Sequence, residues 1–223
     1  NLGASPGSFV ANQLTMGGGS SNGTLKTTAS TALSANRGVT LGAGGGTIET
    51  AAATTLTVNG VIAGTTGALN KTGAGTLVVT AANTYAGTTN VSAGTLQVGD
   101  GATGSLTGAS GVNVTGSGSK LSGSGSIAGS TILGSDTILA PGVGDTDGSN
   151  QTLNFTAVEV QNGGQVQLSI TSRTEQLGST DMTTLTDALA GGSYTTVAAL
   201  FTSGQLNAYK TTTPGNHDYI NIT

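Results

Sequence analysis

A short phrase of glycine, threonine and an aliphatic residue returns along this chain and limits its fold more than any other feature. Two close copies, Gly75-Thr76-Leu77 and Gly94-Thr95-Leu96, are 19 residues apart. Looser copies begin at Gly23 and Gly46, so the successive steps are 23, 29 and 19 residues. A turn residue that leads into a short apolar strand about every 20 to 30 residues is typical of a solenoid, because one such unit cannot bury its apolar face alone.

The composition favours an all-β protein whose polarity comes from hydroxyl groups rather than charges. The 223 residues include 39 glycines, no tryptophan and no cysteine, and only 7% are charged, whereas charged residues make up about a quarter of average proteins. Sparse charge argues against a disordered chain, and the mixture of Val, Ile and Leu with Thr and Ser suits pleated strands. Without disulfides, stability must come from backbone hydrogen bonds and packing.

Several function classes are disfavoured by the same composition. The net charge is −4 and the six Lys and Arg residues are scattered, so no basic face is expected for nucleic acid. No apolar run reaches the roughly 18 residues that a membrane helix needs. The single histidine, His217, is expected in a polar loop, and the ten carboxylates are spread thinly. We therefore expect no enzyme, because no nucleophile, base and acid come together in the pattern.

Short apolar runs bounded by Gly, Asn, Ser or Asp predict the strands. The first is expected at residues 9–16, and the others at 24–28, 39–41, 47–50, 55–58, 61–62, 77–79, 96–98, 112–114, 132–133, 138–139 and 165–170. Strands this short are typical of the faces of a parallel β-helix, where alternate residues point inward and the bends fall on glycine. We expect one such coil over residues 1–172.

The pattern changes after Arg173, which predicts a less regular C-terminal segment at 173–223. Met182, Leu185 and Leu189 follow helical spacing and predict a short helix within residues 175–192. Four of the seven aromatic residues lie beyond position 190. We expect this segment to cap the coil or to form a junction, with these aromatics as candidates for assembly: Tyr194, Phe201, Tyr209 and Tyr219.

A central motif at residues 67–99 carries a family resemblance. Its run Leu69-x-Lys71-x-Gly73-x-Gly75, followed by Asn83-Thr-Tyr85-x-Gly87 and Gly94-Thr-Leu, resembles the autotransporter-associated β-strand repeat of bacterial surface proteins. The flanking residues 36–48 and 121–142 resemble the segments that commonly precede and follow this repeat. The resemblance implies a right-handed parallel β-helix, exported and displayed outside the cell. The chain opens and closes within the strand pattern, so we expect a section of a longer array.

The resemblance implies a scaffold rather than an activity, and it names the positions of the repeat. Those positions are Lys71, Gly73, Gly75, Asn83, Tyr85, Gly87 and Gly94. We expect Lys71, like Arg37 upstream, on the coil surface, and the Tyr85 ring over a coil edge. Asn83 is expected to bond turn backbone, as asparagine commonly does in turns.

One acidic cluster offers a weak metal candidate. Asp145, Asp147 and Asn150 resemble the first half of a calcium loop but lack its closing glutamate. We favour a solvated turn, with weak Ca²⁺ binding as the alternative, and expect no other cofactor. Glycosylation is a side possibility at six Asn-x-Ser/Thr triplets: Asn22, Asn70, Asn90, Asn113, Asn154 and Asn221.

The function predicted from the sequence is structural. Open strand edges at the ends of a solenoid must be capped or paired, so we expect self-association end to end into a fibre or a stalk at the bacterial exterior. The alternative is an adhesin that binds glycan or a partner protein through residues 173–223. An ice-binding protein is a third hypothesis, disfavoured because the threonines show no regular register.

Overall fold

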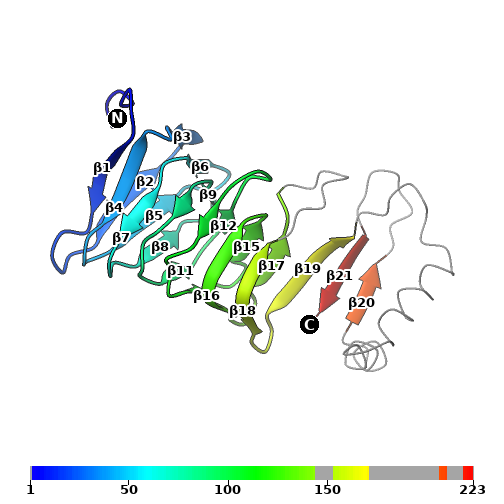
Figure 1. The fold of residues 1–223 in the computed structure, drawn as a ribbon. Helices are drawn as coiled ribbons and strands as arrows, with labels where there is room; N and C mark the ends of the chain where they lie inside the picture. The colour runs from blue at the N-terminus through cyan, green and yellow to red at the C-terminus, as the bar shows by residue number, and fades with distance from the viewer. Residues whose placement is uncertain (1, 144–152, 171–205, 210–217, 223) are drawn as a thin grey trace.

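The computed structural model describes residues 2–143, 153–170, 206–209 and 218–222 of the chain. Within these ranges every regular element is a β-strand, which confirms the all-β expectation (Figure 1). The helix expected within residues 175–192 lies outside the described residues, so it stays a prediction.

The strands lie on three faces of a coil. The first face is a sheet of β1 (Val10–Met16), β4 (Arg37–Leu41) and β7 (Ile62–Gly64). The second contains β2 (Gly23–Thr27), β5 (Gly46–Thr50), β8 (Leu69–Thr72), β11 (Thr89–Val91), β14 (Gly111–Val114), β16 (Ser126–Leu133) and β18 (Asn154–Val160), and β10 (Ala82–Asn83) and β13 (Ser105–Leu106) join it through β16. The third contains β3 (Thr31–Leu33), β6 (Thr55–Val58), β9 (Thr76–Val79), β12 (Thr95–Val98), β15 (Lys120–Gly123), β17 (Ile138–Pro141), β19 (Gln165–Ile170), β21 (Asp218–Ile222) and β20 (Leu206–Tyr209).

The pairings among β1 to β19 are parallel, so each turn of the coil stacks on the one before it. This arrangement is a β-solenoid, as the recurring phrase predicted (Figure 1). The right-handed winding of the coil is inferred from the family resemblance.

The recurring phrase belongs to two different faces. Thr76-Leu77 of β9 pairs directly with Thr95-Leu96 of β12 on the third face. The copies that begin at Gly23 and Gly46 pair with each other in β2 and β5, on the second face. The 29-residue step between Gly46 and Gly75 therefore joins two faces, which explains why the spacing in the sequence is irregular.

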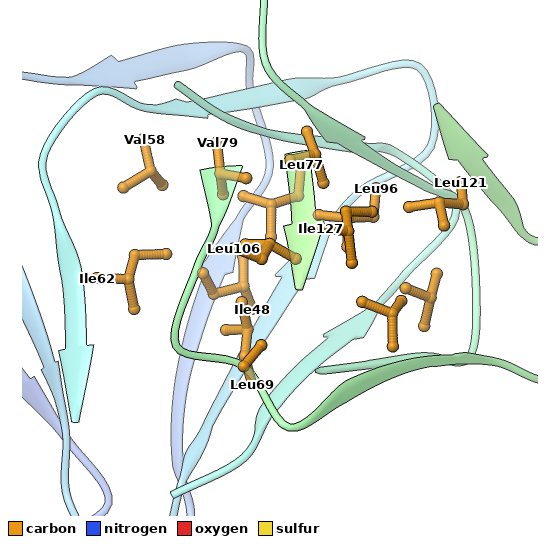
Figure 2. Close-up of a cluster of buried hydrophobic side chains, with 14 of the residues drawn as sticks. Ile48, Val58, Ile62, Leu69, Leu77, Val79, Leu96, Leu106, Leu121 and Ile127 are labelled. Atoms are coloured by element: carbon orange, nitrogen blue, oxygen red, sulfur yellow. The ribbon is translucent and has the colours of Figure 1, made fainter. Parts of the chain in front are cut away.

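Stacked aliphatic side chains form a continuous core. On the third face, successive strands place leucines one above another, and each is at most 4% exposed: Leu56, Leu77, Leu96, Leu121 and Leu139. Figure 2 shows leucines of this column meeting Ile48 and Leu69 of the second face inside the coil. Burying one such side chain contributes about 1.5 to 3 kcal/mol, so the column is a main source of stability.

The parallel ladder of the third face ends in antiparallel strands. β21 pairs antiparallel with β19, and β20 pairs antiparallel with β21 (Figure 1). The second face ends instead at β18, which pairs with β16. The expected division of the chain at residue 172 stays a prediction, although β20 and β21 extend the sheet of the coil.

Candidate functional site

The motif glycines lie where neighbouring turns approach too closely for any side chain. Gly73 has φ +71°, and a Cβ atom there would lie 2.3 Å from the Thr50 carbonyl oxygen. A Cβ atom at Gly87 would lie 2.2 Å from the carbonyl oxygen of Gly67. Real Cβ contacts are not this short, so the backbone would have to move. The same crowding occurs at the remaining two motif glycines, Gly75 and Gly94.

The expectation that Lys71 and Arg37 lie on the coil surface is wrong, because they are 0% and 3% exposed. Lys71 lies in β8 between Ile48 of β5 and Val91 of β11, in a column that is otherwise aliphatic. The alternation of the strand was the signal in the sequence: a residue two positions from the inward Leu69 must also point inward.

The Lys71 ammonium is held by main-chain oxygens alone. Its Nζ donates hydrogen bonds to the carbonyl oxygens of Thr72 (2.8 Å), Gly73 (2.7 Å) and Ala93 (3.0 Å). These three bonds use all three donors of the ammonium. Burial away from water lowers the pKa of Lys71 to about 8. The side chain is therefore fully occupied inside the coil and ties two turns together.

Arg37 makes the same kind of contact at the N-terminal end. Its guanidinium donates to the carbonyl oxygens of Leu2 (3.0 Å), Gly3 (3.1 Å) and Ala4 (2.9 Å). The lead-in segment is thereby held against the first turns. Beside it lies a hollow of about 360 Å³ whose lining includes Leu25 and Leu33.

Tyr85 lies inside the core rather than over a coil edge, so that expectation is also wrong. Its side chain is 0% exposed and belongs to the main hydrophobic cluster. The hydroxyl group shares a 2.5 Å hydrogen bond with Thr89 Oγ1. Burial raises the pKa of Tyr85 well above its usual value, and the Thr89 bond opposes this only in part.

Asn83 bonds backbone, as expected, and it does so across three turns. Its Oδ1 accepts a hydrogen bond from the Ile62 N–H (2.8 Å), and its Nδ2 donates to the carbonyl oxygens of Ala81 (2.9 Å) and Ser105 (3.1 Å). Ile62 belongs to the preceding turn and Ser105 to the following one. The amide is buried, so these bonds satisfy groups that water cannot reach.

An asparagine ladder on the second face was missed by sequence reasoning. Asn90 Nδ2 donates to Asn70 Oδ1 (2.9 Å), and Asn113 Nδ2 donates to Asn90 Oδ1 (3.3 Å). Three of the Asn-x-Ser/Thr triplets therefore stack in register on the outer surface of β8, β11 and β14. Their spacing of 20 and 23 residues, close to one turn of the coil, was the available signal.

A row of threonines also runs along the third face. Thr55, Thr76 and Thr95 are register partners and half-buried, and the row continues to Lys120. The aligned threonines therefore extend over three turns before a lysine replaces them. This short row favours the ice-binding hypothesis only weakly.

Several candidates lie outside the described residues. These are the calcium candidates Asp145, Asp147 and Asn150, together with Tyr194, Phe201 and His217. The other two assembly candidates are register partners, since Tyr209 of β20 pairs with Tyr219 of β21. In the ranges that the structure describes, no three His, Cys, Asp or Glu side chains gather as a metal site would require.

Comparison with known families identifies the central motif. Residues 69–98 match the family described as passenger-associated-transport-repeat. The family resemblance expected from the sequence is thus confirmed for this stretch. No curated protein and no solved structure matches the chain. Over the described residues, no helix has the length and apolar character needed to cross a membrane.

Proposed function

Because residues 69–98 are a passenger-associated-transport repeat within a stack of parallel strands, we propose that the chain is part of a non-catalytic rod displayed outside the bacterial cell. The repeat and the β-solenoid fit a passenger-like protein. The rod would serve as a stalk, which holds another part of the surface protein away from the membrane.

The observation that carries this proposal is the inward use of the motif side chains. Lys71, Asn83 and Tyr85 are each 0% exposed, and their polar atoms bond to the coil itself. A binding or catalytic motif would present such groups to a ligand. Here Lys71 and Asn83 join neighbouring turns, and the Tyr85 hydroxyl bonds Thr89 within its own turn. All three side chains therefore serve the coil itself, which is the role of a scaffold.

Surface labelling tests the display. Antibody raised against this chain should label intact cells of the source bacterium, and protease added to those cells should remove the label. Labelling that requires lysis of the cells would contradict the proposal. Small-angle X-ray scattering of the purified chain should show an elongated particle, and a compact sphere would contradict the rod.

End-to-end association of the rod is a second proposal, favoured by where the apolar surface lies. The exposed large hydrophobic residues of the described part lie at its two ends: Leu2 (40%) and Phe9 (51%) before the first turn, and Val158 (46%) and Val160 (41%) in β18. Apolar side chains exposed together commonly mark an interface. Both β2 and β18 are also edge strands, whose backbone groups can pair with another chain.

The occupant of these ends would be a second copy of this chain. The antiparallel strands β21 and β20 close the parallel ladder of the third face, which leaves β18 as the parallel edge at that end. Continued pairing from β18 to β2 of another copy would place Val160 over Leu25, because both belong to the column that includes Ile48, Val91 and Leu133.

The association is tested with charged substitutions at β18. The parent chain should form larger species as concentration rises in light scattering, whereas Val158→Lys with Val160→Lys should stay monomeric. Thr115→Lys with Ser130→Lys is the matched control, because both positions are exposed on the side of the coil. A parent chain that stays monomeric at high concentration would contradict the assembly.

The adhesin alternative depends on residues 173–223, of which the structure describes β20 and β21. Binding to a glycan array that disappears when residues 173–223 are deleted would favour it over a passive stalk. Binding that survives this deletion would place recognition on the coil instead.

A further inference from the structure

The buried polar side chains of the matched stretch interrupt columns that are otherwise aliphatic. Lys71 lies between Ile48 and Val91. Asn83 is the register partner of Leu106, which is in turn the partner of Ile127. A coil built only to be stable would continue these columns with leucine or valine, because replacing a buried charge by a well-packed apolar residue is often neutral or stabilising.

The neighbouring strands of the second face offer little else to define their register. β2 reads Gly-Thr-Leu-Lys-Thr, β5 reads Gly-Thr-Ile-Glu-Thr, and β8 reads Leu-Asn-Lys-Thr. A slip of one residue would turn the apolar side chains outward, but a slip of two keeps them inside. If β8 slipped by two residues along β11, Leu69 would lie against Val91 rather than Thr89, which is an acceptable apolar contact.

Lys71 distinguishes the native register from the slipped one. In the native register its ammonium reaches three carbonyl oxygens at the corner that follows β8. A shift of two residues relative to β11 would move the Ala93 carbonyl away from the ammonium. A buried cation without its partners is strongly unfavourable, by several kcal/mol.

Asn83 performs the same selection where the first face changes its pairing. The sheet β1-β4-β7 ends at β7, and the following β10 pairs with β13 instead. The Asn83 amide crosses this junction, since it accepts from Ile62 of β7 and donates to Ser105 of β13. Displacement of β10 along either neighbour would leave a buried amide group unpaired.

We infer that Lys71 and Asn83 act as a register lock, which fixes how the turns of the matched stretch align with the turns on either side. The lock is a property of the coil, so it holds wherever the rod is displayed. It explains why buried polar residues are placed in a core that aliphatic residues would fill.

Engineered disulfides report the register, because the chain has no cysteine of its own. Asn70 and Asn90 are native partners on the outer surface of β8 and β11, so a cysteine pair at these positions should oxidise fully. Asn70 and Ser92 are diagonal, about 8 Å apart for strands about 4.8 Å apart with a rise of about 3.3 Å per residue. That distance exceeds the roughly 7 Å limit for a disulfide, so Asn70→Cys with Ser92→Cys should oxidise only in a chain in which β8 has slipped by two residues along β11.

The test introduces Lys71→Met into both cysteine pairs. We expect oxidation of the diagonal pair to rise by about tenfold or more, because the slipped register no longer leaves a buried charge without partners.

The same test applies to Asn83→Leu with cysteine pairs between β10 and β13. Ala82→Cys with Ser105→Cys reports the native register, because these residues are native partners, and Ala82→Cys with Thr107→Cys reports a slip of two residues. Lys120→Met and Asn113→Leu are matched controls, since both side chains lie on the outer surface and should leave the diagonal pairs unoxidised.

Each outcome decides the inference. Diagonal oxidation in the lock variants but not in the controls supports it. If the lock variants fold and only their native pairs oxidise, the register is set elsewhere and the inference fails. If Lys71→Met abolishes the strand signal in circular dichroism, the residue is needed for stability itself, which also overturns a role in selecting register.

Discussion

At the scale of single residues, this coil places two positively charged side chains inside, where main-chain oxygens bind them. Lys71 and Arg37 each meet three main-chain oxygens and no carboxylate. A cation has several donors, so one side chain can satisfy several buried carbonyl oxygens at once. Of these two cations, Lys71 has a pKa that burial lowers to about 8.

Stability should depend on pH through Lys71 and Tyr85. The native pKa of Lys71 is about 8, below the ordinary 10.5, so between these values the unfolded chain binds more protons and stability rises with pH, by about 2 kcal/mol up to pH 10. The native pKa of Tyr85 is raised above its ordinary 10.0. The unfolded chain therefore loses the phenol proton first, and stability falls above about pH 10.

Urea unfolding between about pH 7 and pH 11 measures both effects. Lys71→Met should abolish the rise and keep the fall, while Tyr85→Phe should abolish the fall and keep the rise. An unchanged rise in the Lys71→Met variant would show that another group is responsible.

The salt dependence should be weak. Lys26 and Glu49 form the ion pair of the described part, with Nζ and Oε1 2.7 Å apart and both side chains well exposed. Exposed pairs contribute at most about 1 kcal/mol and are screened by salt. Lys26→Ala should therefore leave the melting temperature almost unchanged, and a strong dependence of the parent chain on NaCl would contradict this account.

At the scale of elements, the corners rather than the strands limit which sequences are tolerated. Strands need only alternate apolar and polar residues, whereas a corner glycine faces the backbone of the previous turn. Gly87 and Gly73 are such positions. This explains why glycine, more than any apolar residue, marks the repeat.

Gly87→Ala should destabilise the fold by about 2 kcal/mol or more, because the new methyl group meets the Gly67 backbone. Gly18→Ala is the control, since no atom lies within 4 Å of a Cβ at Gly18, and its effect should stay within about 0.5 kcal/mol. Chemical denaturation measures both, and equal effects would remove the argument from close approach.

At the scale of the whole molecule, the coil is a linear stack in which each turn contacts its neighbours. A turn in the middle has two partners and a turn at the end has one, so local opening should be easiest at the ends. We expect amide hydrogen exchange to be slowest in β8, β9, β11 and β12, and faster in β1, β2 and β18. Uniform protection along the chain would show a fold that opens only as a single unit.

The sequence by itself determined the fold class and the position of the repeat, because alternation and glycine spacing are local properties of the chain. The burial of Lys71 follows from the same alternation, whereas its place in the repeat motif led to the expectation of a surface position. The contact of Asn83 with backbone was foreseen, but not its span over three turns.

Only the tertiary structure decided which copies of the phrase stack. It also placed Tyr85 inside the core, aligned Asn70 with Asn90 and Asn113, and closed one face with antiparallel strands. These outcomes depend on how many residues each corner takes up. Corner length is set by contacts between turns that are distant in the sequence, so no local pattern could predict it.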